Sequence, residues 1–218
     1  MWIEFMRIPC LVIGYAFGCI QSAYIISKLM AGIDIRQHGS GNAGASNVQR
    51  VLGNRTGALV LACDILKAVA AYFVCYFAFR ALPLAGLYAG IGVILGHNFP
   101  FFLKFKGGRG IASSVGLFLC LDWRVALCAC AVGLIALAVF RFMSLMSLII
   151  VLLFPIGLIV AGARWEEVLV CFLVTIMAYI QHRGNLKRLF TGTERKISFK
   201  KREKNGKTVN KTVKQGNI

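Results

Sequence analysis

A succession of long apolar segments, separated by short polar gaps, constrains the fold of this chain more than any other feature. A helix of about 20 apolar residues crosses the hydrocarbon core of a bilayer, and shorter or tilted helices also occur. The chain has 218 residues, of which 58% are hydrophobic and only 15% are charged, whereas a soluble domain carries about 25% charged residues. We therefore predict an all-α integral membrane protein. The apolar segments cover residues 3–30, 56–80, 83–97, 111–121, 124–140, 145–162 and 165–182.

The number of spans depends on residues 111–140, which can form one long tilted helix or two short helices that meet at residues 122–124. One helix gives six spans and two helices give seven. With seven, all but five of the 25 Lys and Arg residues lie on one side of the membrane, and Lys and Arg favour the cytoplasm. We therefore predict seven transmembrane helices, with the N-terminus outside and the C-terminus cytoplasmic. The gaps on the cytoplasmic side are then 31–55, 98–110, 141–144 and the chain after residue 182.

The formal net charge of +17 does not indicate a nucleic-acid-binding protein, because the basic residues follow the membrane pattern. Twelve of them come after His182. We predict one polytopic membrane domain over residues 1–196. Residues 197–218 are predicted to be a basic, disordered cytoplasmic tail, which either contacts anionic lipids or only anchors the topology.

Small and polar residues inside the apolar segments indicate helix packing more than chemistry. The pairs Gly14/Gly18, Gly86/Gly90 and Gly92/Gly96 each form GxxxG, which lets helices approach closely in lipid. All eight cysteines lie in apolar segments and form no CxxC, so we interpret them as small hydrophobic residues. Asp64 and Lys67 share a helix face and can pair, either as functional groups or as a structural brace.

Glycine, serine, asparagine and arginine are concentrated in the cytoplasmic gaps, which indicates one site on that face. Glycine-rich backbone exposes N–H groups that bind anions, especially where the loop leads into a helix. The segment KGGRG, residues 106–110, has this position. Positive charge comes from Arg50, Arg55, Lys106, Arg109 and Arg188, and guanidinium groups suit phosphate. We interpret Arg55 as a residue that only anchors the topology.

The stretch HGSGNAGASN, residues 38–47, contains GxGxxG, the spacing of a dinucleotide-binding loop. That fingerprint needs a strand before it and an acidic residue at the end of a second strand. Here a membrane helix precedes the loop, and Asp64 falls inside the next apolar segment. We therefore reject a dinucleotide site and interpret the glycines as phosphate-binding backbone.

The three histidines, His38, His97 and His182, show no metal-ligand spacing, so no metal site is predicted. His182 ends the last apolar segment and is followed by Asn185 and Arg188. A base, an amide donor and a cation at the membrane surface would suit transfer chemistry on a phosphorylated substrate.

Three motifs in order, GSGNAGASNVQR (39–50), KGGRGIAS (106–113) and HRGNLKRLFTGTE (182–194), resemble those of the bacterial acyl-phosphate:glycerol-3-phosphate acyltransferases, the PlsY family. SLMS at 144–147 resembles the further serine motif of that family. The resemblance extends to about residue 196. Ser46 stands where threonine is usual and Arg109 where lysine is usual.

The resemblance implies a multi-pass enzyme of the bacterial cytoplasmic (inner) membrane, with its active site at the cytoplasmic face. Such an enzyme transfers a fatty acyl group from acyl phosphate to the 1-position of glycerol 3-phosphate in phospholipid biosynthesis, giving lysophosphatidic acid and phosphate. It does not use acyl-CoA, and the chain has no HxxxxD acyltransferase motif. The partners expected are the two substrates, membrane lipids and a functional link to the enzyme that makes acyl phosphate, with no nucleic acid and no cofactor.

By motif match, the catalytic residues expected are Ser40, Arg50, His182 and Asn185. The substrate- and phosphate-binding residues expected are Gly41, Asn42, Ser46, Asn47, Lys106, Gly107, Gly108, Arg109, Ser144, Ser147, Arg188 and Glu194, with no metal ligand. Either His182 or a phosphate oxygen of a substrate takes the proton. A transporter or channel for an organic phosphate is the main alternative, but such proteins place binding groups near the midplane within repeats. A structural membrane protein would leave the one-sided motifs unexplained.

Overall fold

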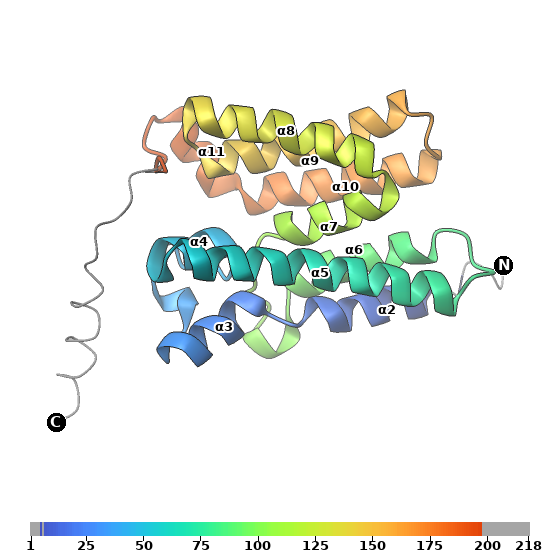
Figure 1. Ribbon diagram of the computed structural model, residues 1–218, viewed down its shortest axis with the longest axis horizontal. Coiled ribbons are helices and arrows are strands. Elements are labelled where there is room, and N and C mark those ends of the chain that lie inside the picture. Colours follow the sequence, from blue (N-terminus) through green and yellow to red (C-terminus); the bar gives the residue numbers. More distant parts are fainter. Residues whose placement is uncertain (1–4, 6, 198–218) are drawn as a thin grey trace.

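The computed structural model describes residue 5 and residues 7–197, and every regular element in that part of the chain is helical (Figure 1). The predicted tail, residues 197–218, therefore lies outside the described residues except for Ile197. The α-helices beyond the first gap are α4 (Ala45–Leu52), α5 (Asn54–Ala78), α6 (Ala85–Asn98), α7 (Ile111–Leu121), α8 (Trp123–Phe140), α9 (Met143–Val160), α10 (Trp165–Gln181) and α11 (Arg183–Phe190).

The first apolar segment forms two helices, α2 (Arg7–Gly18) and α3 (Ser22–Ala31), which together make one candidate span, Arg7–Ala31. The break at residues 19–21 frees backbone carbonyls that a continuous helix would satisfy. The side-chain amide of Gln21 donates to the carbonyl of Gly18 at 3.2 Å, and also to the carbonyls of Gly96 and His97 in α6 at 3.2 and 3.1 Å. The short 3-10 helices are η1 (Ile35–Gln37) and η2 (Phe101–Leu103).

Residues 111–140 form two helices, α7 and α8, as predicted. Asp122 lies between them and caps the second helix, because its carboxylate accepts hydrogen bonds from the backbone N–H groups of Arg124 and Val125 at 2.9 and 3.1 Å. An acidic residue at this position satisfies backbone donors that the helix leaves free. A local polar residue thus starts a new helix where the apolar pattern alone permits one long one.

Five helical segments are long and apolar enough to cross a membrane within the described part of the chain. They are Arg7–Ala31, Asn54–Ala78, Ala85–Leu103, Trp123–Phe140 and Met143–Val160. The pair α10 and α11, bent by 63°, adds a sixth if it is counted as one span. α7 is apolar but has only 11 residues. The fold is therefore that of a multi-pass membrane protein.

The helices form two layers, with α7 between them (Figure 1). One layer contains α2, α3, α5 and α6, and the other contains α8, α9 and α10. Within the first layer α2 and α6 approach so closely that a Cβ on Gly14 or Gly18 would overlap the backbone carbonyls of Ala89 or Val93. The packing predicted from two of the GxxxG pairs is thus confirmed for this pair of helices.

The second layer has its own apolar core, to which α7 contributes. The rings of Phe118 in α7 and Phe154 in α9 stack with their centroids 3.9 Å apart.

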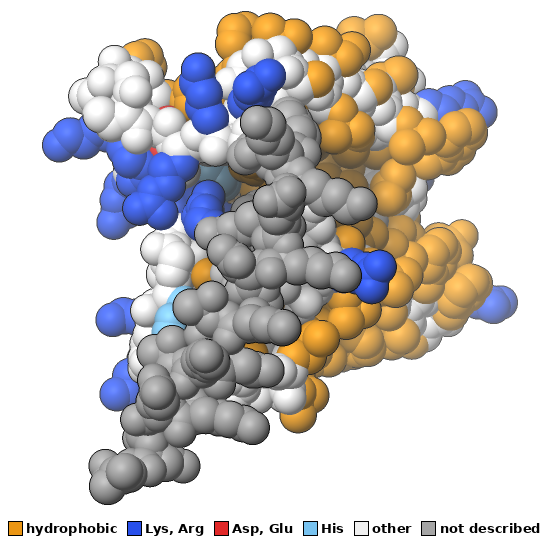
Figure 2. Space-filling model, turned by 60° about the vertical axis from the view of Figure 1, so that its left-hand side comes forward, with side chains coloured by type: hydrophobic (Ala, Val, Ile, Leu, Met, Phe, Trp, Pro, Cys, Tyr) orange, Lys and Arg blue, Asp and Glu red, His pale blue; other side chains and the backbone are white. Residues whose placement is uncertain are grey.

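Large apolar side chains also cover the outer helix faces, where Leu29 is 80% exposed and Val160 is 86% exposed. Figure 2 shows this apolar surface beside a group of Lys and Arg side chains at the end that carries the polar loops. An outside that is apolar around the bundle suits lipid rather than water.

The four polar gaps that the sequence places on one side of the membrane open toward the same end of the bundle (Figure 1, left). They are the segment from α3 to α4, the loop from α6 to α7, the turn between α8 and α9, and the chain after α10. This arrangement brings residues far apart in the sequence to the space between the two layers.

Candidate active site

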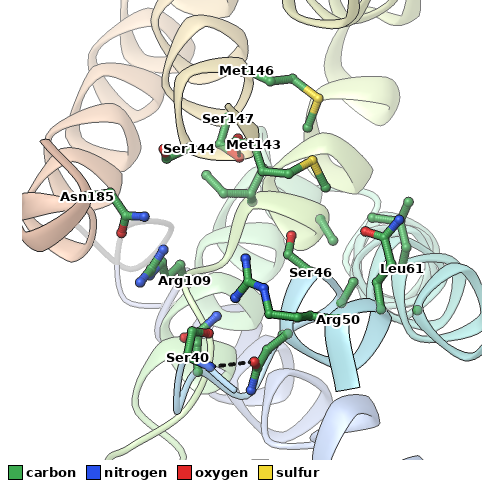
Figure 3. A pocket seen from close by; sticks show the side chains of 18 of the residues that line it. Ser40, Ser46, Arg50, Leu61, Arg109, Met143, Ser144, Met146, Ser147 and Asn185 are labelled. Atoms are coloured by element: carbon green, nitrogen blue, oxygen red, sulfur yellow. Dashed lines mark hydrogen bonds between the residues drawn. The ribbon is translucent and has the colours of Figure 1, made fainter. Parts of the chain in front are cut away.

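A cavity of about 540 Å³ lies between the layers at the end that carries the polar loops. Figure 3 shows side chains converging on it from α4, α5, the start of α9 and α11, and from the loop before α7. It contains residues of all four sequence motifs. The predicted site residues that line it are Ser40, Asn42, Ser46, Asn47, Arg50, Arg109, Ser144, Ser147, His182, Asn185, Arg188 and Glu194.

The other four predicted site residues, Gly41, Lys106, Gly107 and Gly108, are not among the residues that line the cavity. The N–H groups of Gly107 and Gly108 donate to the carbonyls of Asn98 and His97 at 3.2 and 3.0 Å, so they are not free for a phosphate. A Cβ on Gly108 would overlap the His97 ring. In this structure the double glycine permits close packing against the end of α6, and Lys106 is exposed.

Asn47 fixes the conformation of the glycine-rich loop that precedes α4. Its side-chain oxygen accepts a hydrogen bond from the backbone N–H of Ser40 at 2.8 Å, and its amide nitrogen donates to the carbonyls of Ile35 and His38 at 3.1 and 2.9 Å. The side chain is buried, and a buried amide without partners would be costly. Asn47 therefore shapes the loop that presents Ser40 to the cavity (Figure 3).

Glu194 connects the C-terminal motif to α9. One carboxylate oxygen accepts hydrogen bonds from Ser144 at 2.9 Å and Asn185 at 2.6 Å, and the other accepts from Nε of Arg188 at 2.8 Å. Burial alone would raise the pKa of Glu194, but the hydrogen bonds from Asn185, Ser144 and Arg188 outweigh it and lower the pKa below its ordinary value. Glu194 is therefore an anion that holds three other site residues in place.

Arg50 and Arg109 face the cavity (Figure 3) and form no hydrogen bond or ion pair with any residue that the structure describes. Burial lowers the pKa of both guanidinium groups, and nearby cations, Arg195 beside Arg50 and Arg188 beside Arg109, lower it further, while the carboxylate of Glu194 raises it. Arginine nevertheless stays charged at any physiological pH. Because Glu194 is already paired with Arg188, positive charge exceeds negative charge along the cavity wall, which is the arrangement an anionic ligand requires.

His182 lies at the junction of α10 and α11 and is buried beside the cavity. Its Nδ1 lies 2.8 Å from the carbonyl of Ala178. A carbonyl only accepts, so Nδ1 carries the proton and the lone pair of a neutral ring is on Nε2. The side-chain oxygen of Asn185 is buried without a partner in the described part of the chain. A base and a free acceptor thus flank the cavity.

The two serines of α9 differ in their contacts. Ser144 donates to Glu194, whereas Ser147 donates to the carbonyl of Met143 in the preceding turn at 2.9 Å. Both hydroxyl groups lie at the cavity wall beside Met143 (Figure 3).

Several lining residues were not predicted as site residues. Asp64 and His97 line the cavity, and so do Leu61, Met146 and Arg195. Arg195 directly follows the third motif, so its position was a signal that could have been used. Met146 lies within the SLMS motif, so it carried a similar signal. Leu61 and His97 carry none, because only the packing of α5 and α6 brings them to the cavity.

The sequence and the fold both match known proteins. The sequence model of the family described as "Glycerol-3-phosphate acyltransferase" matches residues 8–192. The glycerol-3-phosphate acyltransferase of Clostridioides difficile (strain 630) is 41% identical over 201 residues, which cover 90% of this chain and 98% of that protein. That of Thermoanaerobacter sp. (strain X514) is 40% identical over 189 residues, covering 87% and 94%.

Two crystal structures of PlsY (YgiH), an integral membrane glycerol 3-phosphate acyltransferase, have the same fold. The glycerol 3-phosphate form has a TM-score of 0.80 and 31% sequence identity, covering 91% of this chain and 96% of that one. The lysophosphatidic acid form has a TM-score of 0.81 and 31% identity, covering 88% and 95%.

Proposed function

The chain belongs to the glycerol-3-phosphate acyltransferase family, and we propose that it transfers a fatty acyl group from acyl phosphate to the 1-hydroxyl of glycerol 3-phosphate. The observation that carries this proposal is the pair of arginines, Arg50 and Arg109, which face one cavity without partners among the described residues. Guanidinium groups bind phosphate oxygens through paired hydrogen bonds. Because both substrates carry a phosphate, two such cations can hold them together despite their mutual repulsion.

The reaction needs no covalent enzyme intermediate, because acyl phosphate is an activated mixed anhydride. The glycerol hydroxyl oxygen attacks the carbonyl carbon, the bond from that carbon to the phosphate oxygen breaks, and phosphate leaves with the electron pair. The hydroxyl proton goes either to Nε2 of His182 or to a phosphate oxygen of a substrate. The protein aligns the hydroxyl with the carbonyl and stabilises the developing negative charge.

In this assignment Ser40, Ser46 and Asn42 add neutral donors beside the arginines, and Asn185 accepts a hydrogen bond from the glycerol backbone. Ser144, Arg188 and Glu194 form a connected wall that fixes Asn185. The roles of Lys106, Gly107 and Gly108 in holding phosphate stay a prediction, which would require the loop to rearrange when substrate binds.

An apolar wall of the cavity suits the acyl chain. Leu61 in α5 and Met143 and Met146 in α9 line this wall (Figure 3). Leu61 is also 45% exposed. We therefore infer that the acyl chain lies in the bilayer and reaches the cavity between α5 and α9.

We also infer seven spans, obtained by counting α7 as a short one and α10 with α11 as one bent span. An odd number places the termini on opposite sides. The basic residues of the polar loops favour a cytoplasmic location for the cavity and the C-terminus, with the N-terminus outside. The membrane is then the bacterial cytoplasmic membrane, and an enzyme that makes acyl phosphate must act before this one.

The test is an assay of purified protein with glycerol 3-phosphate and either palmitoyl phosphate or palmitoyl-CoA, measuring lysophosphatidic acid and released phosphate. We expect product from palmitoyl phosphate only. Each variant, Arg50→Ala and Arg109→Ala, should lower kcat/KM by about 10- to 100-fold, the cost of losing one charged hydrogen-bonding partner. Arg55→Ala is the matched control, because Arg55 is exposed and does not line the cavity.

Other outcomes would contradict separate parts of the proposal. Equal product from palmitoyl-CoA would refute acyl phosphate as the specific donor but leave acyl transfer intact. A loss in Arg55→Ala as large as in Arg50→Ala would mean that charge in general, not the cavity, matters. Liposomes that accumulate labelled glycerol 3-phosphate without releasing phosphate from palmitoyl phosphate would favour the transporter.

A further inference from the structure

A buried ion pair in α5 lies beside the break between α2 and α3. The Lys67 ammonium is 2.8 Å from a carboxylate oxygen of Asp64, and the two side chains are only 5% and 1% exposed. The same carboxylate oxygen accepts a hydrogen bond from Ser22, the first residue of α3, at 3.0 Å. Buried charges are stable only when they are paired and hydrogen-bonded.

Lys67 also donates hydrogen bonds to backbone carbonyls at the break between α2 and α3. Its ammonium donates to the carbonyl of Gly18 at 3.3 Å and to that of Ile20 at 2.8 Å. Non-helical backbone at membrane depth needs such partners, because no water is available there. This explains why a charged residue is present within the span, and the ion pair confirms the predicted pairing of Asp64 with Lys67.

The brace does not explain a fourth contact. The Lys67 ammonium lies 2.9 Å from Nδ1 of His97 in α6. The ammonium has three N–H groups for its four acceptors, so the longest contact, with Gly18 at 3.3 Å, shares one of them. An ammonium only donates, so Nδ1 accepts and the proton of the neutral ring is on Nε2. His97 lines the cavity and is buried. Nε2 lies beside Gly108 and has no hydrogen-bond partner among the described residues.

We propose that Asp64 and Lys67 are positioning residues that fix His97 as an N–H donor to an oxygen of a phosphorylated substrate in the cavity. The proposal rests on the proposed function and adds a residue outside the sequence motifs to the site. A neutral donor at the cavity wall would complement Arg50 and Arg109 without adding to their mutual repulsion. It would also explain why residue 108 is glycine, since the side chain of any larger residue there would displace Nε2 of His97.

The first test is nitrogen-15 NMR of the histidine rings in wild-type protein, with the His97 signals assigned through a His97→Asn variant. We expect a neutral His97 ring with the proton on Nε2 and none on Nδ1. In Lys67→Met no ammonium donates to Nδ1, so we expect part of the His97 rings to carry the proton on Nδ1 instead. Adding glycerol 3-phosphate or a non-hydrolysable acyl phosphate analogue should shift the Nε2 signal, and the ligand that does so identifies the substrate bound. Protonated Nδ1, or no response to either ligand, would overturn the proposal.

The second test compares two amide substitutions by steady-state kinetics. In His97→Asn the amide can still accept from Lys67 but is too short to reach the Nε2 position, whereas in His97→Gln it can donate from that position. We expect His97→Asn to raise KM for one phosphorylated substrate about tenfold and His97→Gln to raise it less than threefold. The measurement includes the melting temperature and KM for each substrate separately.

A purely structural role predicts the opposite order, because His97→Asn preserves the contact with the buried ion pair. If both variants lose kcat and melting temperature together with unchanged KM, His97 is only part of the brace. Failure of the proposed function is distinguishable, because wild-type protein would then make no lysophosphatidic acid, whereas failure of this inference leaves wild-type activity intact.

Discussion

At the scale of single residues, the cavity is defined by charges that do not balance. Glu194 forms its ion pair with Arg188, whereas Arg50 and Arg109 form none with any residue that the structure describes. Close cations repel each other, and an arginine in a dry environment loses hydration. A bound phosphate would offset both the repulsion between the two guanidinium groups and their lost hydration. The uncompensated charge that lowers the stability of the empty site therefore favours the binding of anionic ligands.

Glu194 yields a prediction about pH. Its pKa is lowered in the folded protein from an ordinary value of 4.5, so its contacts stabilise the fold above that value and are lost as the pH falls through the lowered pKa. We expect the melting temperature of wild-type protein to fall as the pH decreases below about 4.5, the ordinary pKa. Glu194→Gln should show a lower melting temperature at neutral pH and a flatter pH dependence. Differential scanning fluorimetry in one detergent measures both.

The control for this prediction is Glu167→Gln, because Glu167 lies at the opposite end of the bundle and does not line the cavity. Its pH dependence should follow that of wild type. If Glu194→Gln has the same pH profile as wild type, the three hydrogen bonds to its carboxylate do not contribute to stability and the assigned cause is wrong.

Residue types were the part of the site most accessible to sequence reasoning. Arg50, His182 and Glu194 were predicted from motifs and do line the cavity. Gly107 and Gly108 were predicted to cradle phosphate, but their N–H groups are bound to backbone carbonyls at the end of α6. A glycine motif shows that no side chain can be accommodated at these positions, but it does not reveal whether a ligand or another part of the chain lies against the backbone there.

At the scale of elements, the helices differ from the apolar pattern mainly where polar groups interrupt them. Asp122 starts α8 by capping it, and the break between α2 and α3 depends on Lys67 and Gln21. The first effect is local and could be predicted from the sequence. The second could not, because Lys67 lies more than 40 residues from the break it satisfies.

The contact of α2 with α6 gives a prediction about stability. Gly14→Ala places a methyl group against the backbone of Ala89, where no flexible side chain can move aside. Overpacking of this kind costs about 1–3 kcal/mol, so we expect a clearly lower melting temperature. Gly184→Ala is the matched control, because the only atom near its added Cβ is a side-chain nitrogen of Arg188 at 3.6 Å.

In Gly184→Ala the melting temperature should be unchanged or slightly higher, because Gly184 lies in the first turn of α11 and alanine within a helix is favoured over glycine by up to about 0.5–1 kcal/mol. Equal destabilisation of the two variants would mean that loss of glycine itself matters. The close approach of α2 and α6 would then not be the reason for the GxxxG pairs.

At the scale of the whole molecule, the cavity exists because two layers of helices meet around α7 (Figure 1). At the end opposite the cavity, Arg7 of α2 forms an ion pair with Glu166 of α10 at 2.9 Å, and Tyr88 of α6 also contacts this pair. This cluster joins the two layers. It holds the far end together while the polar end keeps a space large enough for substrate.

The end of the described chain supports a prediction about the tail. Ile197 donates its backbone N–H to the carbonyl of Arg141 at 2.8 Å and lines the cavity. We expect removal of residues 198–218 to leave kcat and KM within about twofold of wild type, because every site residue proposed above precedes residue 198. Removal of residues 194–218 should abolish activity, because Glu194 is lost. The palmitoyl phosphate assay on both truncated proteins measures this.

A large loss of activity in the shorter truncation would assign the basic tail a role in catalysis or substrate delivery. A change confined to binding of anionic vesicles would instead support contact of the tail with lipid headgroups.

The sequence by itself determined the class of protein, the short polar gaps and the residue types at the site, because hydropathy and motif spacing are local properties of the chain. The tertiary structure decided which residues meet. Packing of α5, α6 and α9 brings Asp64, His97 and Leu61, which belong to no motif, to the cavity, and it leaves Arg50 and Arg109 without a hydrogen bond or ion pair to any described residue. Burial and long-range contact depend on the fold as a whole, and no local pattern encodes them.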